Sequence, residues 1–173
     1  ITRILDGETE YFSVLLDRYG RPLYSLIVQI VSCPEDAEEL LQDVFLKAFR
    51  NLSGYKGECR FSTWLYRIAY NTAISATRKK KPEFLYIEEN TINNVPDEKA
   101  DEVISSARDE EQIECLCKAI EQLTGEEKAL ITLFYYEGKS MEEIGEVLKI
   151  TISNVKIRLH RTRKKIYVLM NGK

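Results

Sequence analysis

Apolar residues recur every three or four positions through most of the chain, and this spacing predicts amphipathic helices. The clearest helix runs from Phe61 to Lys81 and stops before Pro82, which disfavours continuation. Its polar face carries Arg67, Asn71, Ser75 and Arg78. Its apolar stripe consists of Phe61, Leu65, Ile68, Thr72 and Ala76, with Trp64, Ala69 and Ala73 beside it.

Three helices are predicted before this one. The first covers Thr9 to Tyr19 and is expected to end at Gly20, after which Pro22 suits the first turn of the next helix. The stripe of that second helix extends to Val31, and a third helix runs from Pro34 to about Leu52.

The C-terminal part of the chain predicts four further helices. The first carries a stripe from Ile113 to Leu123, and capping boxes at Thr124–Glu127 and Ser140–Glu143 begin the second and third. Gly138 suits the end of the second helix, and Thr151 caps the last helix.

Between these two groups, residues 83–109 lose the helical periodicity and contain many acids and asparagines, with one short helix expected after Asp101. We therefore predict an all-α protein with two small helical domains, residues 1–82 and 110–173, joined by a flexible acidic linker at 83–109.

Charge is strongly segregated, although the net charge is only −3. Residues 53–82 carry +6, residues 83–127 carry −11, and residues 149–165 carry +7. Two basic segments around an acidic one are typical of nucleic-acid contact, whereas solvated helix faces are the simpler alternative. Because opposite charges attract at modest salt, we expect a compact free state in which the two domains shield each other's DNA surfaces.

Several function classes are disfavoured. The four cysteines form no C-x-x-C pair and His160 is the only histidine, so neither a zinc site nor another metal or cofactor is expected. No nucleophile–base pair or glycine-rich phosphate loop indicates an enzyme. No apolar run is long enough for membrane insertion, and reduced thiols suit a cytoplasmic protein.

The last two helices, joined by a short turn at Lys149–Ile150, predict a helix-turn-helix that binds DNA. Residues on the exposed side of the last helix can reach base edges, and cations beside them suit phosphates. The first group is Ser153, Asn154, Ile157, Arg158 and Arg161, and the second is Lys156, Arg163, Lys164 and Lys165. A basic helix that contacts protein is the alternative.

Two features of the first domain suggest further contacts. The third helix has an acidic face that suits either solvent or docking of a basic partner helix. The loop at 53–60 contains Tyr55, Lys56 and Arg60, which can accept a base and a phosphate beside the basic helix.

In three segments the sequence resembles the extracytoplasmic-function (ECF) group of bacterial RNA polymerase sigma factors. Residues 35–49 (EDAEELLQDVFLKAF) resemble region 2.2 of that family, and residues 61–73 (FSTWLYRIAYNTA) resemble regions 2.3 and 2.4. Residues 123–165 resemble region 4, above all at SNVKIRLHRTRKK. The sequence departs from the family pattern at Lys149, where glycine is frequent, and at Asn154, where threonine is frequent.

The resemblance implies a sigma factor that binds core RNA polymerase, directs it to promoters and helps to open DNA. The expected partners are the clamp helices of the largest polymerase subunit, the flap of the second subunit, promoter DNA and an anti-sigma factor. It implies core contacts by Glu39, Leu41, Gln42, Asp43 and Phe45. It also implies −10 contacts by Lys56, Arg60, Arg67, Asn71 and Arg78, and −35 contacts by Ser153, Asn154, Lys156, Arg158, Arg161 and Arg163. The alternatives are a helix-turn-helix regulator that acts without polymerase and a protein-binding adaptor.

Overall fold

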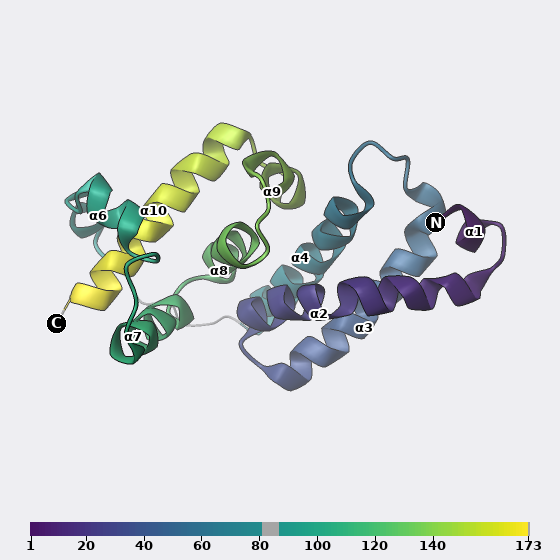
Figure 1. Ribbon diagram of the computed structural model, residues 1–173, viewed down its shortest axis with the longest axis horizontal. Coiled ribbons are helices and arrows are strands. Elements are labelled where there is room, and N and C mark those ends of the chain that lie inside the picture. The colour runs from purple at the N-terminus through teal and green to yellow at the C-terminus, as the bar shows by residue number, and fades with distance from the viewer. Residues whose placement is uncertain (81–86, 173) are drawn as a thin grey trace.

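The computed structural model describes residues 1–80 and 87–172, and in that part of the chain every regular element is a helix (Figure 1). The first domain contains α1 (Thr2–Leu5), η1 (Thr9–Tyr11), α2 (Phe12–Val31), α3 (Pro34–Asn51), η2 (Leu52–Gly54) and α4 (Phe61–Lys80). Next come α5 (Glu89–Asn93) and α6 (Asp97–Glu102). The second domain contains α7 (Glu110–Glu121), α8 (Gly125–Ile131), η3 (Thr132–Tyr136), α9 (Met141–Leu148) and α10 (Ile152–Asn171).

Helices α2, α3 and α4 pack against one another in the first domain. Leu23, Leu26 and Ile27 of α2 are completely buried, together with Val44 of α3 and Leu65 of α4. The predicted break in α2 is wrong, because the helix continues through Gly20 and Pro22 without interruption. A proline inside a helix removes one backbone hydrogen bond. Here the buried stripe that follows Pro22 packs against both neighbouring helices and keeps the helix in one piece.

The helix signals in the second domain are confirmed. Both predicted capping boxes form, with Thr124 before α8 and Ser140 before α9. Thr151 accepts a hydrogen bond from the Asn154 backbone and begins α10. Lys149 takes the left-handed conformation at φ 58°, the conformation that the family's frequent glycine adopts with least strain. The turn before α10 is therefore formed without that glycine.

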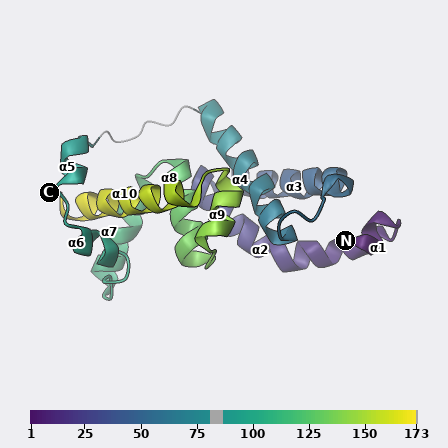
Figure 2. The same cartoon turned by 90° about the horizontal axis from the view of Figure 1, so that it is seen from above.

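The described part of the linker contains two short helices, α5 and α6, which the sequence periodicity did not predict. Both pack against α10 (Figure 2). The single helix expected after Asp101 is wrong in position, because α6 begins at Asp97 and ends at Glu102. Val95, Ala100 and Val103 are buried, so this segment adds its own apolar contacts to the second domain.

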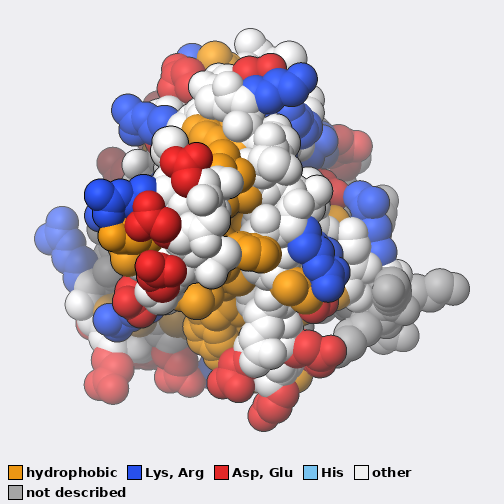
Figure 3. Space-filling view, turned by 90° about the vertical axis from the view of Figure 1, so that its right-hand side faces the viewer, with side chains coloured by type: hydrophobic (Ala, Val, Ile, Leu, Met, Phe, Trp, Pro, Cys, Tyr) orange, Lys and Arg blue, Asp and Glu red, His pale blue; other side chains and the backbone are white. Residues whose placement is uncertain are grey.

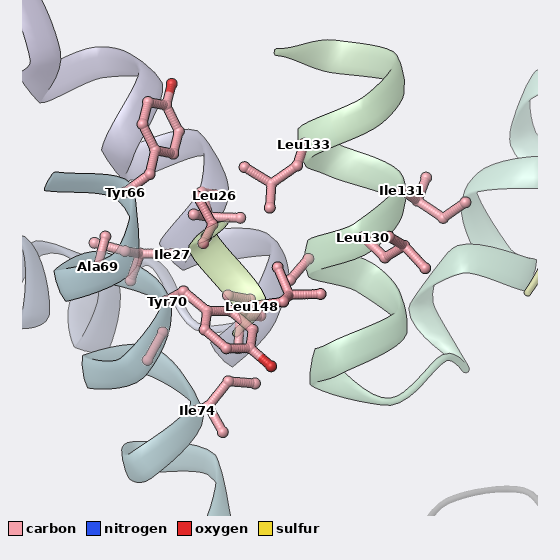
Figure 4. Close-up of a cluster of buried hydrophobic side chains, with 14 of the residues drawn as sticks. Leu26, Ile27, Tyr66, Ala69, Tyr70, Ile74, Leu130, Ile131, Leu133 and Leu148 are labelled. Atoms are coloured by element: carbon pink, nitrogen blue, oxygen red, sulfur yellow. The ribbon is translucent and has the colours of Figure 1, made fainter. Parts of the chain in front are cut away.

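The two domains share one continuous apolar core (Figure 4). On the α4 side the interface contains Tyr66, Tyr70 and Ile74, which face side chains of α8, η3 and α9. These three residues lie outside the apolar stripe predicted for α4. One side of this helix therefore packs in the first domain, and another side packs against the second domain. The facing residues that Figure 4 labels are Leu130, Leu133 and Leu148. The two domains are packed together, but the expected mutual shielding is only partial, because the N-terminal half of α10 stays exposed.

Candidate nucleic-acid and protein interfaces

A polar pocket of about 630 Å³ lies where the C-terminal end of α3 and η2 meet α4. Predicted residue Asn71 lines this pocket and is exposed. The pocket also contains Lys47, whose ammonium group donates a 3.1 Å hydrogen bond to the Thr72 hydroxyl. The remaining lining residues are Arg50, Asn51, Ser53, Gly54, Trp64, Ile68 and Ser75. The lining combines indole and aliphatic carbon with amides, hydroxyls and cations. The apolar groups suit an unstacked base, and the cations suit its phosphate.

The loop that leads into α4 is braced by aromatic packing. The Tyr55 hydroxyl donates a 2.6 Å hydrogen bond to the Cys59 carbonyl, and its ring lies 5.5 Å from that of Phe61 and 5.4 Å from that of Trp64. Gly57 has a φ of +75°, which suits glycine at the tip of the loop. Lys56 and Arg60 project from this braced loop and are exposed.

Three of the predicted −10 arginines face carboxylates of the second domain. Arg67 donates to both the carbonyl and the carboxylate of Glu146 in α9, each at 2.8 Å. Arg60 lies 3.6 Å from Glu143, and Arg78 lies 3.8 Å from Glu126. Arg67 is therefore placed at the domain interface, apart from the open pocket that Asn71 lines. Arg78 is the last residue of α4 whose side chain belongs to the described part of the chain.

Other polar contacts at the domain interface are more deeply buried. The Tyr66 hydroxyl donates to the Glu137 carboxylate, and burial together with that carboxylate raises the pKa of Tyr66. Burial raises the pKa of Tyr70 to about 12. Lys128 of α8 is only 7% exposed and donates a 2.8 Å hydrogen bond to the Ser32 hydroxyl in the first domain. Burial lowers the pKa of Lys128, because a buried ammonium group loses its hydration.

The N-terminal half of α10 presents an open polar surface. Val155 and Leu159 face the core, which leaves the intervening side chains directed outward. The exposed residues are Ile152, Ser153, Asn154, Lys156, Ile157 and Arg158, and Arg158 lies 3.3 Å from Glu126. The helix follows the short turn after α9, so the predicted helix-turn-helix residues of this half lie together on one face.

The C-terminal half of α10 is different, because its cations are paired with carboxylates. Arg161, His160 and Lys164 contact acids of α5 and α6, and Lys165 lies 2.9 Å from Glu127. Arg163 is held more firmly than the others. It donates to the Tyr135 hydroxyl at 2.7 Å and to Asp101 at 2.8 Å, and its side chain is only 17% exposed.

The surface formed by α2 and α3 combines an apolar groove with acidic residues. The groove has a volume of about 480 Å³ and is lined almost wholly by carbon. Its lining residues are Phe12, Leu16, Gly20, Leu41, Gln42, Phe45, Leu46 and Phe49. Figure 3 shows this end of the molecule, where apolar side chains lie between charged ones. Glu39, Gln42 and Asp43 are exposed, whereas Leu41 is half-buried and Phe45 buried.

Sequence reasoning missed the α3 contribution to the polar pocket. Lys47, Arg50 and Asn51 lie on the last turns of α3, opposite its acidic first turn. In the sequence, these cationic and amide side chains directly precede the 53–60 loop, and this proximity could have indicated that they belong to the same site. Within the described ranges, the structure holds no cluster of histidine, cysteine and acidic residues that suits a metal, and no helix with the length and apolarity to cross a bilayer. The four cysteines are unpaired thiols.

Comparison with known proteins agrees with this layout. The sequence matches the family model for sigma-70 region 2 over residues 15–83 and that for sigma-70 region 4 over residues 113–166. It is 30% identical over 177 residues to the ECF RNA polymerase sigma factor SigW of Bacillus subtilis, covering 95% of this chain and 91% of that protein. The chain belongs to the ECF RNA polymerase sigma factors.

Other relatives of this sigma factor span it equally well. The ECF sigma-E factor of Haemophilus influenzae is 31% identical over 176 residues, which cover 96% of this chain and 90% of that one. The fold resembles that of CnrH in complex with the cytosolic domain of CnrY, with a TM-score of 0.67, 20% identity and coverage of 99% and 95%. It also resembles RpoE of Bartonella quintana in complex with the anti-sigma factor NepR, with a TM-score of 0.62, 21% identity and coverage of 95% and 96%.

The family assignment confirms the resemblance in sequence and the all-α architecture. This sigma factor binds core RNA polymerase, directs it to promoters and helps to open DNA for transcription initiation. The family consists of transcription initiation factors, and a regulator that acts without core polymerase is not favoured.

Proposed function

We propose that this sigma factor divides its work among three surfaces of the described structure. The first domain, residues 1–82, contacts core polymerase with α2 and α3 and the −10 element with α3 and α4. The second domain, residues 110–173, contacts the −35 duplex with α10, and residues 83–109 connect the two. The observation that carries this assignment is the open polar face at the start of α10, which directly follows the helix-turn-helix turn.

The α2–α3 surface suits an amphipathic, basic partner. Leu41 and Phe45 contribute to an apolar groove, and exposed Glu39 and Asp43 add negative charge beside it. A helix with an apolar stripe and flanking cations satisfies both features. We assign this surface to binding of the clamp helices of the largest polymerase subunit. We assign the second domain to binding of the flap of the second subunit.

The pocket between α3 and α4 suits the non-template strand of the −10 element. Asn71 offers donors and acceptors to a base edge, and Lys47 and Arg50 offer charge to its phosphate. Lys56 and Arg60 extend this basic path along the loop, and Arg67 and Arg78 join it when the second domain moves away. Extrusion of bases into such a site favours the open form of the promoter.

The first two turns of α10 suit the major groove of the −35 element. Ser153, Asn154 and Arg158 are within the part of the helix that enters the groove, and Lys156 lies beside the phosphates. Arg161 lies one turn further on and contacts DNA backbone once its present carboxylate partner leaves. Arg163 serves mainly to fix α10 on η3, because its guanidinium is shared between Tyr135 and Asp101.

Two further expectations follow from these surfaces. The groove and the domain interface offer an anti-sigma factor a way to block polymerase, as the complexes of CnrH and RpoE involve comparable folds. The protein acts in the cytoplasm, where polymerase and promoter DNA are found, and carries out no catalysis of its own.

Reconstitution with core RNA polymerase tests the assignment. The wild-type chain should produce promoter-dependent transcripts, and core polymerase alone should not. Glu39→Lys with Asp43→Lys should weaken core binding without unfolding the chain, because both residues are exposed. Asn71→Ala should spare core binding but reduce permanganate reactivity in the promoter bubble. A folded double variant with unchanged core affinity, or a normal bubble with Asn71→Ala, contradicts the corresponding surface.

A further inference from the structure

We infer that residues 89–102, here named the linker latch, occupy the anion-binding side of α10 in the free sigma factor and must leave before that side binds DNA backbone. The latch consists of α5, α6 and the turn between them, and both helices pack on α10 (Figure 2). This inference rests on the proposed contact between α10 and duplex DNA. It adds an internal competitor for that contact.

Ion pairs connect the latch to α10 at three carboxylates. Each carboxylate lies against a cation of the C-terminal half of α10, and Asp97 also lies 3.1 Å from the His160 ring. Lys164 and His160 hold the pKa of Asp97 below its ordinary value, so this carboxylate remains charged near neutral pH. The three pairs are Glu89 with Arg161 at 2.8 Å, Asp97 with Lys164 at 2.7 Å and Asp101 with Arg163 at 2.8 Å.

Apolar contacts give the latch a defined position on the domain. Ala100 is completely buried and Val95 is 7% exposed, and Val103, which directly follows the latch, is 5% exposed. The Lys99 ammonium group lies 5.7 Å from the centre of the Tyr167 ring in α10. A diffuse attraction between an acidic segment and a basic helix does not bury specific side chains. The latch therefore combines a fixed apolar seat with the charge pairs.

The latch and DNA backbone require the same cations. A phosphate that approaches Arg161 or Lys164 meets the latch carboxylate already beside that cation, and the repulsion between the two anions makes them compete for it. When the competent state is only partly populated, the apparent affinity for DNA falls in proportion to that fraction. The N-terminal half of α10 stays exposed in the latched state. The latch therefore removes backbone contacts, which supply most of the sequence-independent affinity, and leaves the base-contacting end open.

Core polymerase offers a route to release. Polymerase that binds both domains stretches the connection between them, and an extended linker cannot keep α5 and α6 seated on α10. Binding energy for polymerase thus shifts the population toward the unlatched state. Under this arrangement, free sigma factor is kept from nonspecific DNA until it joins polymerase.

The test neutralises the latch in the full-length chain. The latch variant carries Glu89→Gln, Asp97→Asn and Asp101→Asn. The matched control carries Glu88→Gln, Glu98→Gln and Glu102→Gln, which remove the same charge from exposed positions of the same segment that form no ion pair with a described residue. The probe is a fluorescent duplex of mixed sequence, because backbone contacts do not depend on sequence. At low salt the latch variant should bind about three- to ten-fold more tightly than the control.

Hydrogen exchange supplies a second readout that does not depend on affinity. Amides of α5 and α6 should exchange faster in the latch variant than in the control, and faster in the wild-type chain once saturating duplex is added. Equal DNA affinity of the two variants, or unchanged exchange on addition of duplex, overturns the latch.

A third variant separates this result from failure of the proposed function. Arg158→Ala lies outside the latch and should weaken duplex binding in every background. If it does so while latch neutralisation has no effect, the latch alone is wrong. If Arg158→Ala and Arg161→Ala both leave duplex binding unchanged, α10 does not bind DNA, and both the latch and the −35 assignment are overturned.

Discussion

Described cations of α4 and of the C-terminal half of α10 are held by carboxylates in the free protein, but these carboxylates come from different parts of the chain. Arg67 of α4 is held by Glu146, a residue of the opposite domain. Arg161 and Lys164 of α10 are held by the linker, within their own half of the molecule. Movement of the domains therefore exposes α4, whereas exposure of α10 requires the linker to detach as well.

This difference indicates two separable steps of activation. The contacts that cover α4 lie in the shared apolar core, so they are lost together when the domains part. The contacts that cover α10 combine a small buried patch with ion pairs whose carboxylates are exposed to solvent, which weakens each pair. We therefore expect the domain interface to be the stronger of the two restraints.

The largest effect is expected from a wedge at the domain interface. Gly125 begins α8, and a Cβ added there lies 3.2 Å from Ile30 Cγ2 and 3.3 Å from Ile74 Cδ1 in the first domain. Gly125→Leu should destabilise docking by about 1–3 kcal/mol, because the packed side chains cannot yield to its full volume. Single-stranded DNA should bind more tightly as Arg67 and the α4 face open, while duplex affinity should stay nearly constant.

Distances between labels in the two domains and anisotropy with both kinds of oligonucleotide would measure this effect. Gly125→Ala serves as a graded control, since its single methyl group requires a shift of only a few tenths of an ångström. An equal rise in duplex affinity would show that domain docking, and not the linker, covers α10.

An opposite and smaller effect is expected at Lys128, which is buried at the same interface. Lys128→Met should strengthen docking by about 1–2 kcal/mol, because it removes a charge that has lost much of its hydration and is compensated only by the more distant Glu121 carboxylate. Ser32, its present partner, is exposed and can bond to water. Thermal unfolding and the distance between domain labels would report the gain.

The pH dependence of docking tests whether the charge of Lys128 is the cause of this effect. Its pKa is lower in the docked state than in the open state, so the open state binds more protons between the two values. Lys128 should therefore strengthen docking as pH rises from its lowered pKa toward the ordinary lysine value of about 10.4. Tyr66 and Tyr70, whose pKa values are raised at the same interface, weaken docking at higher pH, so the Lys128 component is the difference between the wild-type chain and Lys128→Met. Lys128→Met should lose this component. A variant that keeps the full alkaline gain would exclude Lys128 as its source.

The smallest effect concerns the end of α10 that the latch leaves open. Ile157 is 59% exposed among polar neighbours, and its branched side chain suits the methyl group of a thymine in the major groove. Ile157→Ser should weaken binding to one −35 position by about 0.8 kcal/mol, the value of one buried methylene group. Replacing single thymines by deoxyuridine in the promoter, which removes only the methyl group, should identify that position in assays with holoenzyme.

The Ile157→Ser variant should be insensitive to the same deoxyuridine. If no single deoxyuridine weakens binding of the wild-type protein, Ile157 makes no contact with a thymine methyl group. Because Ile157 lies outside the latch, its effect should be equal in wild-type and latch-neutralised chains. Unequal effects would mean that the two halves of α10 do not act independently.

Local signals allowed most of the fold to be predicted. The capping boxes at Thr124 and Ser140, and the cap at Thr151, fix helix starts through contacts three residues apart, so they can be found in the sequence. The stripe after Pro22 suggested a new helix for the same local reason. Its actual continuity with the preceding turns depends on packing against α3 and α4, which no local pattern contains.

The candidate sites were predictable to the extent that each lies on one helix. Exposure of Glu39, Gln42 and Asp43 follows from the stripe of α3, and exposure of Asn154 and Arg158 from that of α10. The pocket required Lys47 from one helix and Asn71 from another to meet, and the separation of Arg67 from it required the opposite domain. Charge segregation predicted attraction between acidic and basic segments, but not which carboxylate each cation meets.

Glu126 affects how readily the two docked domains can separate. Its carboxylate lies near Arg78 of the first domain and Arg158 of α10, one arginine from each helix that we propose to bind DNA. It also stands in the first turn of α8, where the positive end of the helix dipole favours negative charge. Both arginines can therefore depart without stranding an unfavourable charge. Separation of the domains therefore costs little free energy at this carboxylate, and the closed form opens here without a compensating partner.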